Sequence, residues 1–169
     1  MAEDAPRDRL LPALLDRLTD EHPGQPEARR DRSFSRRDYR RAVLRDLAWL
    51  LNANAPPADE LEEFPLVARS VLNFGMTELA GRTASALSPE ELERQVRDAI
   101  RAFEPRILPP PPGSRTEFVR AVEAADAEAG NVIHLEINGL LWAEETPEAL
   151  YLKTEIDLES GQCRLKEEG

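Results

Sequence analysis

Apolar side chains recur every three or four residues at three places in the first two thirds of the chain, which is the spacing of one helix face. The first stripe comprises Leu10, Leu11, Leu14, Leu15 and Leu18. The second comprises Tyr39, Val43, Leu47 and Leu50. The third comprises Leu92, Val96, Ala99, Ile100 and Phe103. We therefore expect three helices, each with one buried face.

Two of these helices have clear start signals. Ser35 followed by Asp38 has the form of a capping box, in which the serine side chain serves an orphan N–H of the first turn. Ser88 precedes a proline at the first helical position and has Glu91 three residues later. Between these helices, an acidic linker leads to a short helical piece that starts at Phe64-Pro65 and ends at Gly75.

The apolar period changes to two after Pro105, which indicates strands. The inward positions that we expect are Ile133, Leu135 and Ile137, then Leu150, Leu152, Thr154, Ile156 and Leu158. A short final strand is expected around Arg164, after a turn. Helices followed by strands predict an α+β fold, with N-terminal helices packed on a small C-terminal antiparallel sheet. We expect residues 1–8 to be disordered and residues 9–166 to form one domain, helical over 9–104 and a sheet over 115–166.

Charge and cysteine usage narrow the class of protein. The 169 residues carry a net charge of -11, which is the sum of +1 over residues 1–50 and -12 over residues 51–169. Such a chain repels nucleic acid and anionic membranes, so we expect neither nucleic-acid binding nor direct membrane insertion. The single cysteine, Cys163, cannot form an intramolecular disulfide, and no secretory signal or long apolar run is present. These features favour a cytoplasmic protein.

Catalytic, cofactor and metal patterns are missing from the sequence. His22, His134 and Cys163 are not spaced like metal ligands. No nucleophile elbow and no phosphate-binding glycine loop is present. The 33 acidic residues make carboxylate pairs uninformative, and 5% aromatic content argues against a sugar-stacking groove. We therefore expect a protein that is not an enzyme and needs no cofactor.

A basic cluster runs from Arg29 to Arg45. Its arginines are Arg29, Arg30, Arg32, Arg36, Arg37, Arg40, Arg41 and Arg45, offset only by Asp31 and Asp38. It could bind nucleic acid or an acidic partner. The interpretation that we favour is a helix face that pairs with the acidic remainder of the chain or with a protein partner, since no aromatic residue or nucleic-acid motif accompanies it.

Glu104-Pro105-Arg106 stands directly at the end of the third helix. Proline disfavours the helical conformation of the residue before it, so Glu104 is expected to leave the helix extended. Residues two apart in an extended chain point to the same side, so Glu104 and Arg106 would project as a charged pair from a rigid corner. Such a pair can make directional contacts with a partner. From these residues alone, however, the favoured interpretation is an ordinary exposed charge pair at a helix end, worth less than about 1 kcal/mol to the fold.

Four segments together resemble TssE, the baseplate subunit of the type VI secretion system, and its lysozyme-like phage baseplate-wedge relatives. They are Leu14-Leu15-Asp16-Arg17-Leu18; Leu44-Arg45-Asp46-Leu47 with Trp49-Leu50-Leu51-Asn52; Val67-Ala68-Arg69-Ser70-Val71-Leu72-Asn73-Phe74-Gly75; and Glu104-Pro105-Arg106-Ile107. The order and spacing also fit, and the resemblance covers residues 9–165. Phe74 stands where tyrosine is common, and the four prolines after Leu108 are unusual.

The resemblance implies a structural role. Proteins of this family lie in the baseplate wedge beside TssF, TssG and TssK, at the base of the sheath made by TssB and TssC. They link baseplate to sheath and help to start sheath polymerisation. The resemblance gives Glu104, Pro105 and Arg106 an assembly-contact role, and nothing in the sequence supports a muramidase site.

We expect sheath strands to add to an edge of the C-terminal sheet by main-chain hydrogen bonds. Replacing Arg106 by alanine would then impair sheath assembly and leave thermal stability almost unchanged. If the variant instead unfolds, the corner is structural and the assembly-contact assignment is wrong. The other hypotheses are a murein hydrolase of the secretion channel, a regulatory adaptor, and a subunit of a phage or defective-prophage tail.

Overall fold

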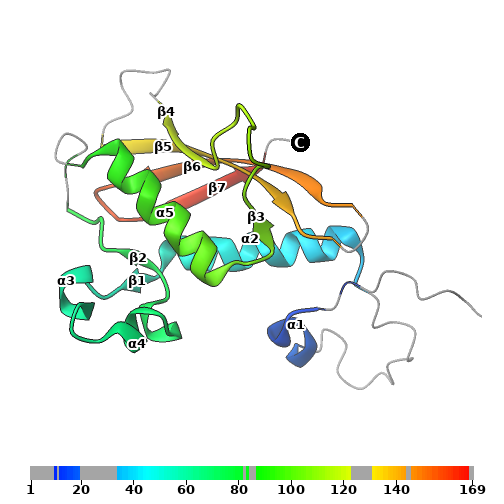
Figure 1. Ribbon diagram of the computed structural model, residues 1–169, viewed down its shortest axis with the longest axis horizontal. Helices are drawn as coiled ribbons and strands as arrows, with labels where there is room; N and C mark the ends of the chain where they lie inside the picture. Colours follow the sequence, from blue (N-terminus) through cyan, green and yellow to red (C-terminus); the bar gives the residue numbers. More distant parts are fainter. Residues whose placement is uncertain are drawn as a thin grey trace, which may run out of the picture.

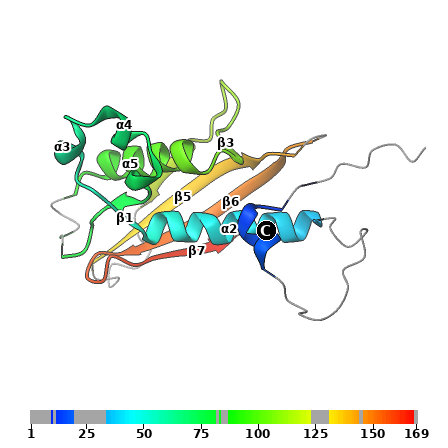
Figure 2. The ribbon, with the colours of Figure 1, turned by 90° about the horizontal axis from the view of Figure 1, so that it is seen from below.

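A computed structural model describes residues 10, 12–19, 34–81, 83, 87–122, 131–143 and 146–167. The expected disordered segment 1–8 lies outside the described residues. The model has two layers, with two long helices, α2 (Arg36–Asn52) and α5 (Pro89–Phe103), on one face of a five-stranded sheet (Figures 1 and 2). The predicted α+β class is confirmed.

The sheet contains β3 (Ile107–Leu108), β4 (Val119–Val122), β5 (Val132–Leu141), β6 (Glu148–Asp157) and β7 (Cys163–Glu167). Its order is β3-β5-β6-β7, and β4 also pairs with β5, with every pairing antiparallel. Alternate side chains of β6 are buried, namely Leu150, Leu152, Thr154 and Ile156, as the period of two predicts. Because β7 comes last in the strand order, it is one edge of the described sheet.

Both predicted caps are present. The Oγ of Ser35 accepts a hydrogen bond from the backbone N–H of Asp38 at 3.1 Å, and its hydroxyl donates to the Asp38 carboxylate at 2.5 Å. The Oγ of Ser88 accepts from the N–H of Glu91 at 3.4 Å, with Pro89 in the first turn. The two helices bury their predicted faces against the sheet, including Val43, Leu47, Leu92, Val96 and Ile100.

The expected N-terminal stripe is wrong as a single buried face. Helix α1 covers only Leu14–Leu18 and begins after Pro12, which cannot continue a helix because it lacks an N–H. Leu10 is buried in the core, whereas Leu14 and Leu18 are 69% and 74% exposed. A helix of five residues is too short to bury a long stripe, so its leucines are left for other contacts.

The segment between the long helices is compact. It contains β1 (Asn54–Ala55), α3 (Ala58–Leu61), α4 (Pro65–Ala68), the 3-10 helix η1 (Val71–Asn73) and β2 (Met76–Thr77). β1 and β2 pair in parallel, which returns the chain to the end of α2. Gly75 makes this return possible, because its φ is +129° and a Cβ there would lie 2.3 Å from the Ala53 carbonyl oxygen.

Candidate protein-interaction site

The segment Glu104-Pro105-Arg106 forms the turn between helix α5 and strand β3 of the sheet. Helix α5 ends at Phe103, and the N–H of Glu104 still donates to the Ile100 carbonyl at 2.8 Å. The N–H of Ile107 then donates to the Glu104 carbonyl at 3.1 Å. The next strand, β3, pairs directly with β5, so both ends of the turn are fixed.

Glu104 and Arg106 are bound to each other. The Nε of Arg106 donates to Glu104 Oε1 at 2.6 Å, and its Nη2 donates to Oε2 at 2.5 Å, which makes the pair bidentate. The same side chain donates to Asp46 Oδ2 of α2 at 2.7 Å. Arg106 therefore ties the end of α5 to α2.

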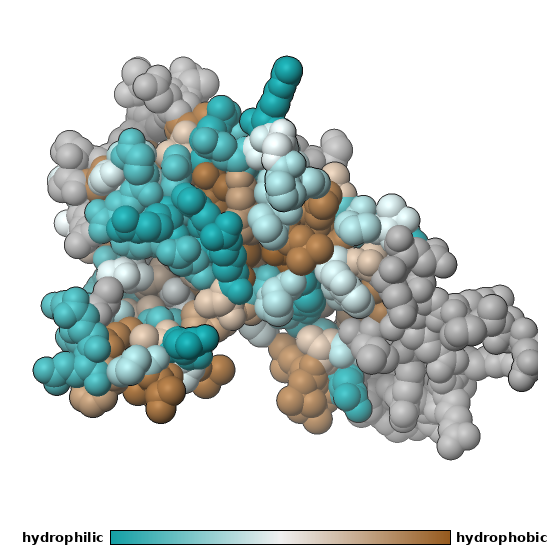
Figure 3. All heavy atoms as spheres, viewed as in Figure 1, coloured by the Kyte–Doolittle hydropathy of each residue, from teal (hydrophilic) through white to brown (hydrophobic). Residues whose placement is uncertain are grey.

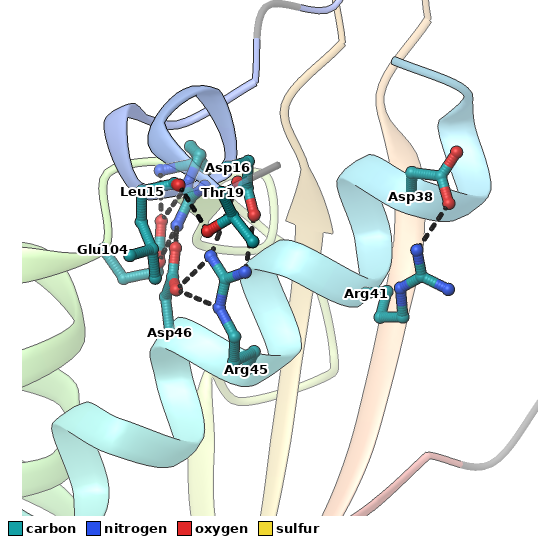
Figure 4. Close-up of polar contacts among 9 residues, drawn as sticks. Leu15, Asp16, Thr19, Asp38, Arg41, Arg45, Asp46 and Glu104 are labelled. Atoms are coloured by element: carbon teal, nitrogen blue, oxygen red, sulfur yellow. Dashed lines mark hydrogen bonds and ion pairs between the residues drawn. The ribbon is translucent and has the colours of Figure 1, made fainter. Parts of the chain in front are cut away.

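The network continues to α1 (Figure 4). Arg45, beside Asp46 in the sequence, donates to Asp46 Oδ1 at 2.9 Å and to Asp16 Oδ1 at 2.5 Å. Its guanidinium also lies 5.2 Å from the ring centroid of Trp49, a cation–π distance. Acid and base thus alternate from Asp16 through Arg45, Asp46 and Arg106 to Glu104, and the chain of ion pairs joins α1, α2 and α5.

These contacts favour the charged forms of both arginines. Hydrogen bonding to Glu104 is the largest cause that raises the pKa of Arg106, and Asp46 adds to it against the opposing effect of burial. The pKa of Arg45 is raised chiefly by its hydrogen bond to Asp16. Burial raises the pKa of Tyr39, a neighbour on α2. The network therefore holds two permanent cations between three carboxylates.

The Glu104–Arg106 pair is less exposed than the sequence predicted. Glu104 is only 3% exposed, and Arg106 is half-buried. Pro105 is exposed at the tip of the turn. The extended conformation that we expected for Glu104 is wrong, because its φ of -127° and ψ of 68° lie outside the extended region. Its side chain turns inward, where both of its oxygens accept hydrogen bonds from Arg106. Proximity of Glu104 to Arg106 was expected correctly, whereas exposure of the pair was not.

An apolar groove of about 290 Å³ opens beside the network. It is lined by Leu15, Asp46, Trp49, Leu50, Phe74, Phe103, Glu104 and Arg106. Phe74 and Phe103 meet edge to face at 5.5 Å between ring centroids. Figure 3 shows this side of the molecule hollowed between apolar side chains of α1 and α4. A charged floor between apolar walls suits an apolar protein segment with one polar group.

Sequence reasoning did not assign Asp16, Arg45, Asp46 or Trp49 to the site. A signal for them existed, because these residues occur in the segments that carry the family resemblance. Each charge also interrupts an apolar run, where an unpaired charge would be costly. Their pairing across 29 and 60 residues of sequence could not be read from local spacing.

The basic cluster on α2 pairs mainly with acidic residues of the same chain. Arg36 contacts Glu148, Arg40 contacts Glu148 and Glu167, and Arg41 contacts Asp38. Arg29, Arg30 and Arg32 lie outside the described residues. For Arg36, Arg40 and Arg41 the interpretation of a helix face paired with acidic residues of the same chain is supported.

Each carboxylate of the network is paired with an arginine. Both oxygens of Glu104 accept hydrogen bonds from the permanent cation Arg106, so this carboxylate is not available as a general acid or base. Among the described residues, no group of His, Cys, Asp and Glu side chains could hold a metal ion. Within the same residues no helix is long and apolar enough to cross a membrane.

A comparison with protein-family models identifies the family of this chain. The family model described as baseplate wedge protein gp25 matches residues 37–146. This chain belongs to the gp25 baseplate wedge family. The matched residues run from α2 through β5, so they include Asp46, Glu104, Pro105 and Arg106 of the network.

Membership of the gp25 family confirms the resemblance that the four segments indicated. The family is a structural one, in which subunits assemble with other baseplate components. The strands β6 and β7 lie beyond the matched residues. Comparisons with curated proteins and with solved structures gave no match.

Proposed function

We propose that this gp25-family chain is the subunit of a type VI secretion baseplate that links the wedge to the contractile sheath and helps to start sheath polymerisation. Its membership of a baseplate wedge family is the observation that carries the proposal. The proposed partners are TssF, TssG and TssK in the wedge and TssB and TssC in the sheath. Glu104, Pro105 and Arg106 are the proposed contact residues.

The edge of the sheet supports a link to other strands. The N–H of Asp157 donates to the Gln162 carbonyl, and antiparallel pairs alternate, so Cys163, Leu165 and Glu167 direct their backbone groups away from β6. Asn52 occupies the first of these positions: its side-chain amide donates to the Cys163 carbonyl at 3.0 Å and accepts from the Cys163 N–H at 2.9 Å.

The free part of the edge is therefore short and defined. Asn52 acts as the end of a neighbouring strand, and the outward backbone groups of Leu165 and Glu167 follow it. A strand added from a sheath subunit would pair at these two residues, with its register limited by the Asn52 amide. A short, partly capped edge also lowers the aggregation hazard of an open sheet.

The groove beside Arg106 supports a second contact, with the wedge. Its apolar walls and its half-buried guanidinium suit a partner segment that places an apolar side chain against Trp49 and Phe74. Pro105 is exposed at the tip of the turn and stands in the sequence between Glu104 and Arg106, which both line the groove. The charged pair would then fix the geometry of the turn that the partner contacts.

Affinity purification of the tagged chain from its native host, followed by mass spectrometry, tests the proposal. Recovery of TssF, TssG, TssK or the sheath subunits supports it. Recovery of phage-tail proteins instead would assign the chain to a tail baseplate, the alternative with which the same family membership is also compatible. A monomer that recovers none of them would contradict the wedge role.

A further inference from the structure

Four large apolar side chains stand out on consecutive short helices between α2 and α5. Phe64, Leu66, Val71 and Leu72 are 56%, 85%, 81% and 68% exposed. We call this set the α4–η1 surface. Figure 3 shows apolar side chains gathered over α4, beside hydrophilic side chains at the position of α3. Single exposed apolar residues are ordinary, but a cluster at one place marks a contact surface.

The backbone beneath this surface is held firmly. The Ser70 hydroxyl donates to the Val67 carbonyl at 2.9 Å, and the Asn73 amide donates to the Ala68 carbonyl at 2.9 Å. The next residue, Phe74, packs on Phe103 of α5. The apolar side chains are thus presented by a segment that is anchored at its end, which reduces the entropy that binding would cost.

The surface has an acidic rim. Asp59, Glu60, Glu62 and Glu63 directly precede it and are exposed, against one arginine, Arg69. Within the part of the chain that the structure describes, none of these four carboxylates is in an ion pair. An apolar centre with unpaired charge at its rim is the usual anatomy of a protein interface, in which the rim sets the sign of the partner.

We propose that the α4–η1 surface docks a basic amphipathic segment of another protein, with apolar side chains on Leu66, Val71 and Leu72 and lysine or arginine side chains opposite the acidic rim. A second copy of the chain fits poorly, because a symmetric contact would bring two acidic rims together. An anionic membrane is repelled by the same carboxylates. The surface uses neither the β7 edge nor the Glu104–Arg106 pair, so this inference goes beyond the proposed function.

Site-specific photo-crosslinking in the host identifies the occupant. Benzoylphenylalanine is introduced in place of Leu66 in one strain and in place of Trp142, which is exposed elsewhere, in a control strain. The expected result is a crosslink from position 66 alone, to a peptide that carries lysine or arginine beside apolar residues. A crosslink to the chain itself, to an acidic or uncharged segment, or to nothing would overturn the proposal.

A synthetic peptide of the crosslinked segment then tests the chemistry with the purified full chain. The triple variant Glu60→Gln, Glu62→Gln, Glu63→Gln is expected to bind about tenfold more weakly, with a smaller dependence on salt. The variant Asp98→Asn, Glu117→Gln, Glu159→Gln removes the same charge from exposed positions elsewhere and is expected to bind within about twofold of the parent.

The apolar contribution has its own variant. Replacing Leu66 and Leu72 by serine is expected to weaken peptide binding by more than about tenfold, because both side chains lose apolar area that the complex buries. Circular dichroism melts check that each variant is folded. Equal weakening by the rim variant and its charge-matched control would show a long-range charge effect without a docking site, and would overturn the proposal.

Discussion

The Nε and Nη2 nitrogens of Arg106 both donate hydrogen bonds to the carboxylate of Glu104, which is only 3% exposed. A buried carboxylate depends on its cation much more than an exposed one does. The pair that resembles an assembly contact is therefore also part of the fold, and experiments on it must separate the two roles.

Replacing Arg106 by alanine is expected to lower the free energy of unfolding by about 3 kcal/mol, because it leaves Glu104 buried without a cation. This differs from the almost unchanged stability expected for an exposed pair. Urea unfolding followed by circular dichroism measures the change. Unchanged stability would mean that Glu104 has another way to be neutralised or solvated.

The double variant Glu104→Met, Arg106→Met separates folding from assembly. It removes both charges and keeps the apolar bulk, so most of the stability is expected to return, while Asp46 keeps its bond to Arg45. Co-purification of wedge subunits is then measured. Loss of the wedge subunits with a folded protein assigns a contact role to the charges, whereas retention restricts the pair to a structural role.

Asn52 is expected to keep the edge of the sheet closed at Cys163. Burial raises the pKa of the Cys163 thiol to about 12, so the thiol should react very slowly with iodoacetamide in the native state at pH 8. Replacing Asn52 by alanine leaves the N–H and carbonyl of Cys163 without their partners and should cost about 1–3 kcal/mol. Labelling of Cys163 is expected to accelerate in this variant, and an unchanged rate would contradict the role of Asn52.

A proline at position 165 tests strand addition at the β7 edge. The N–H of Leu165 points away from β6, so proline there removes no bond inside the sheet. Replacement by alanine loses the same side chain and keeps the N–H, which makes it the matched control. Sheath formation, imaged through a fluorescent sheath subunit, is expected to fail in the proline variant alone. Equal sheath formation in both variants would exclude pairing at this residue.

Glu136 gives a pH dependence with a definite sign. A hydrogen bond from Tyr151 is the largest cause that lowers its pKa from the ordinary 4.5, and Arg120 adds to it. A lowered pKa contributes stability above pH 4.5, and this stability is lost as the pH falls through the lower folded value. Replacing Glu136 by glutamine should therefore cost stability at pH 7 and progressively less below pH 4.5, as urea unfolding across the pH range would show. Replacing Tyr151 by phenylalanine should give the same trend, and parallel curves would contradict it.

Substitutions at Gly75 and Gly113 separate the cost of backbone strain from the cost of a steric clash. Both have a positive φ, but a Cβ on Gly113 meets nothing within 4 Å, whereas one on Gly75 would enter the Ala53 carbonyl. Replacing Gly113 by alanine is expected to cost about 1 kcal/mol and replacing Gly75 more than about 3 kcal/mol, measured as unfolding free energies. Similar losses would show that the return of the chain at Gly75 can shift.

The sequence predicted the elements whose signal is local. Ser35 and Ser88 mark the starts of α2 and α5, and the period of two marks the buried residues of β6, because caps and sheet faces are set by neighbours in the chain. A helix at α1 was predicted, but the exposure of Leu14 and Leu18 was not, since α1 is tied to another helix by the ion pair of Asp16 with Arg45. The placement of Arg106, the cation that faces the buried Glu104, also involves Asp46, 60 residues earlier in the sequence. Ion pairs between residues far apart in the sequence produce no local spacing pattern from which they could be predicted.

The long sequence separation between helix α2 and strand β7 has a consequence for synthesis of the protein. Asn52 on α2 and Cys163 on β7 are bonded across 111 residues, and Arg40 reaches Glu167 across 127. Helix α2 emerges from the ribosome long before the strand that it packs against, so its apolar face must wait uncovered. Chaperone binding during translation is therefore expected at α2, and release is expected only once β7 has left the exit tunnel.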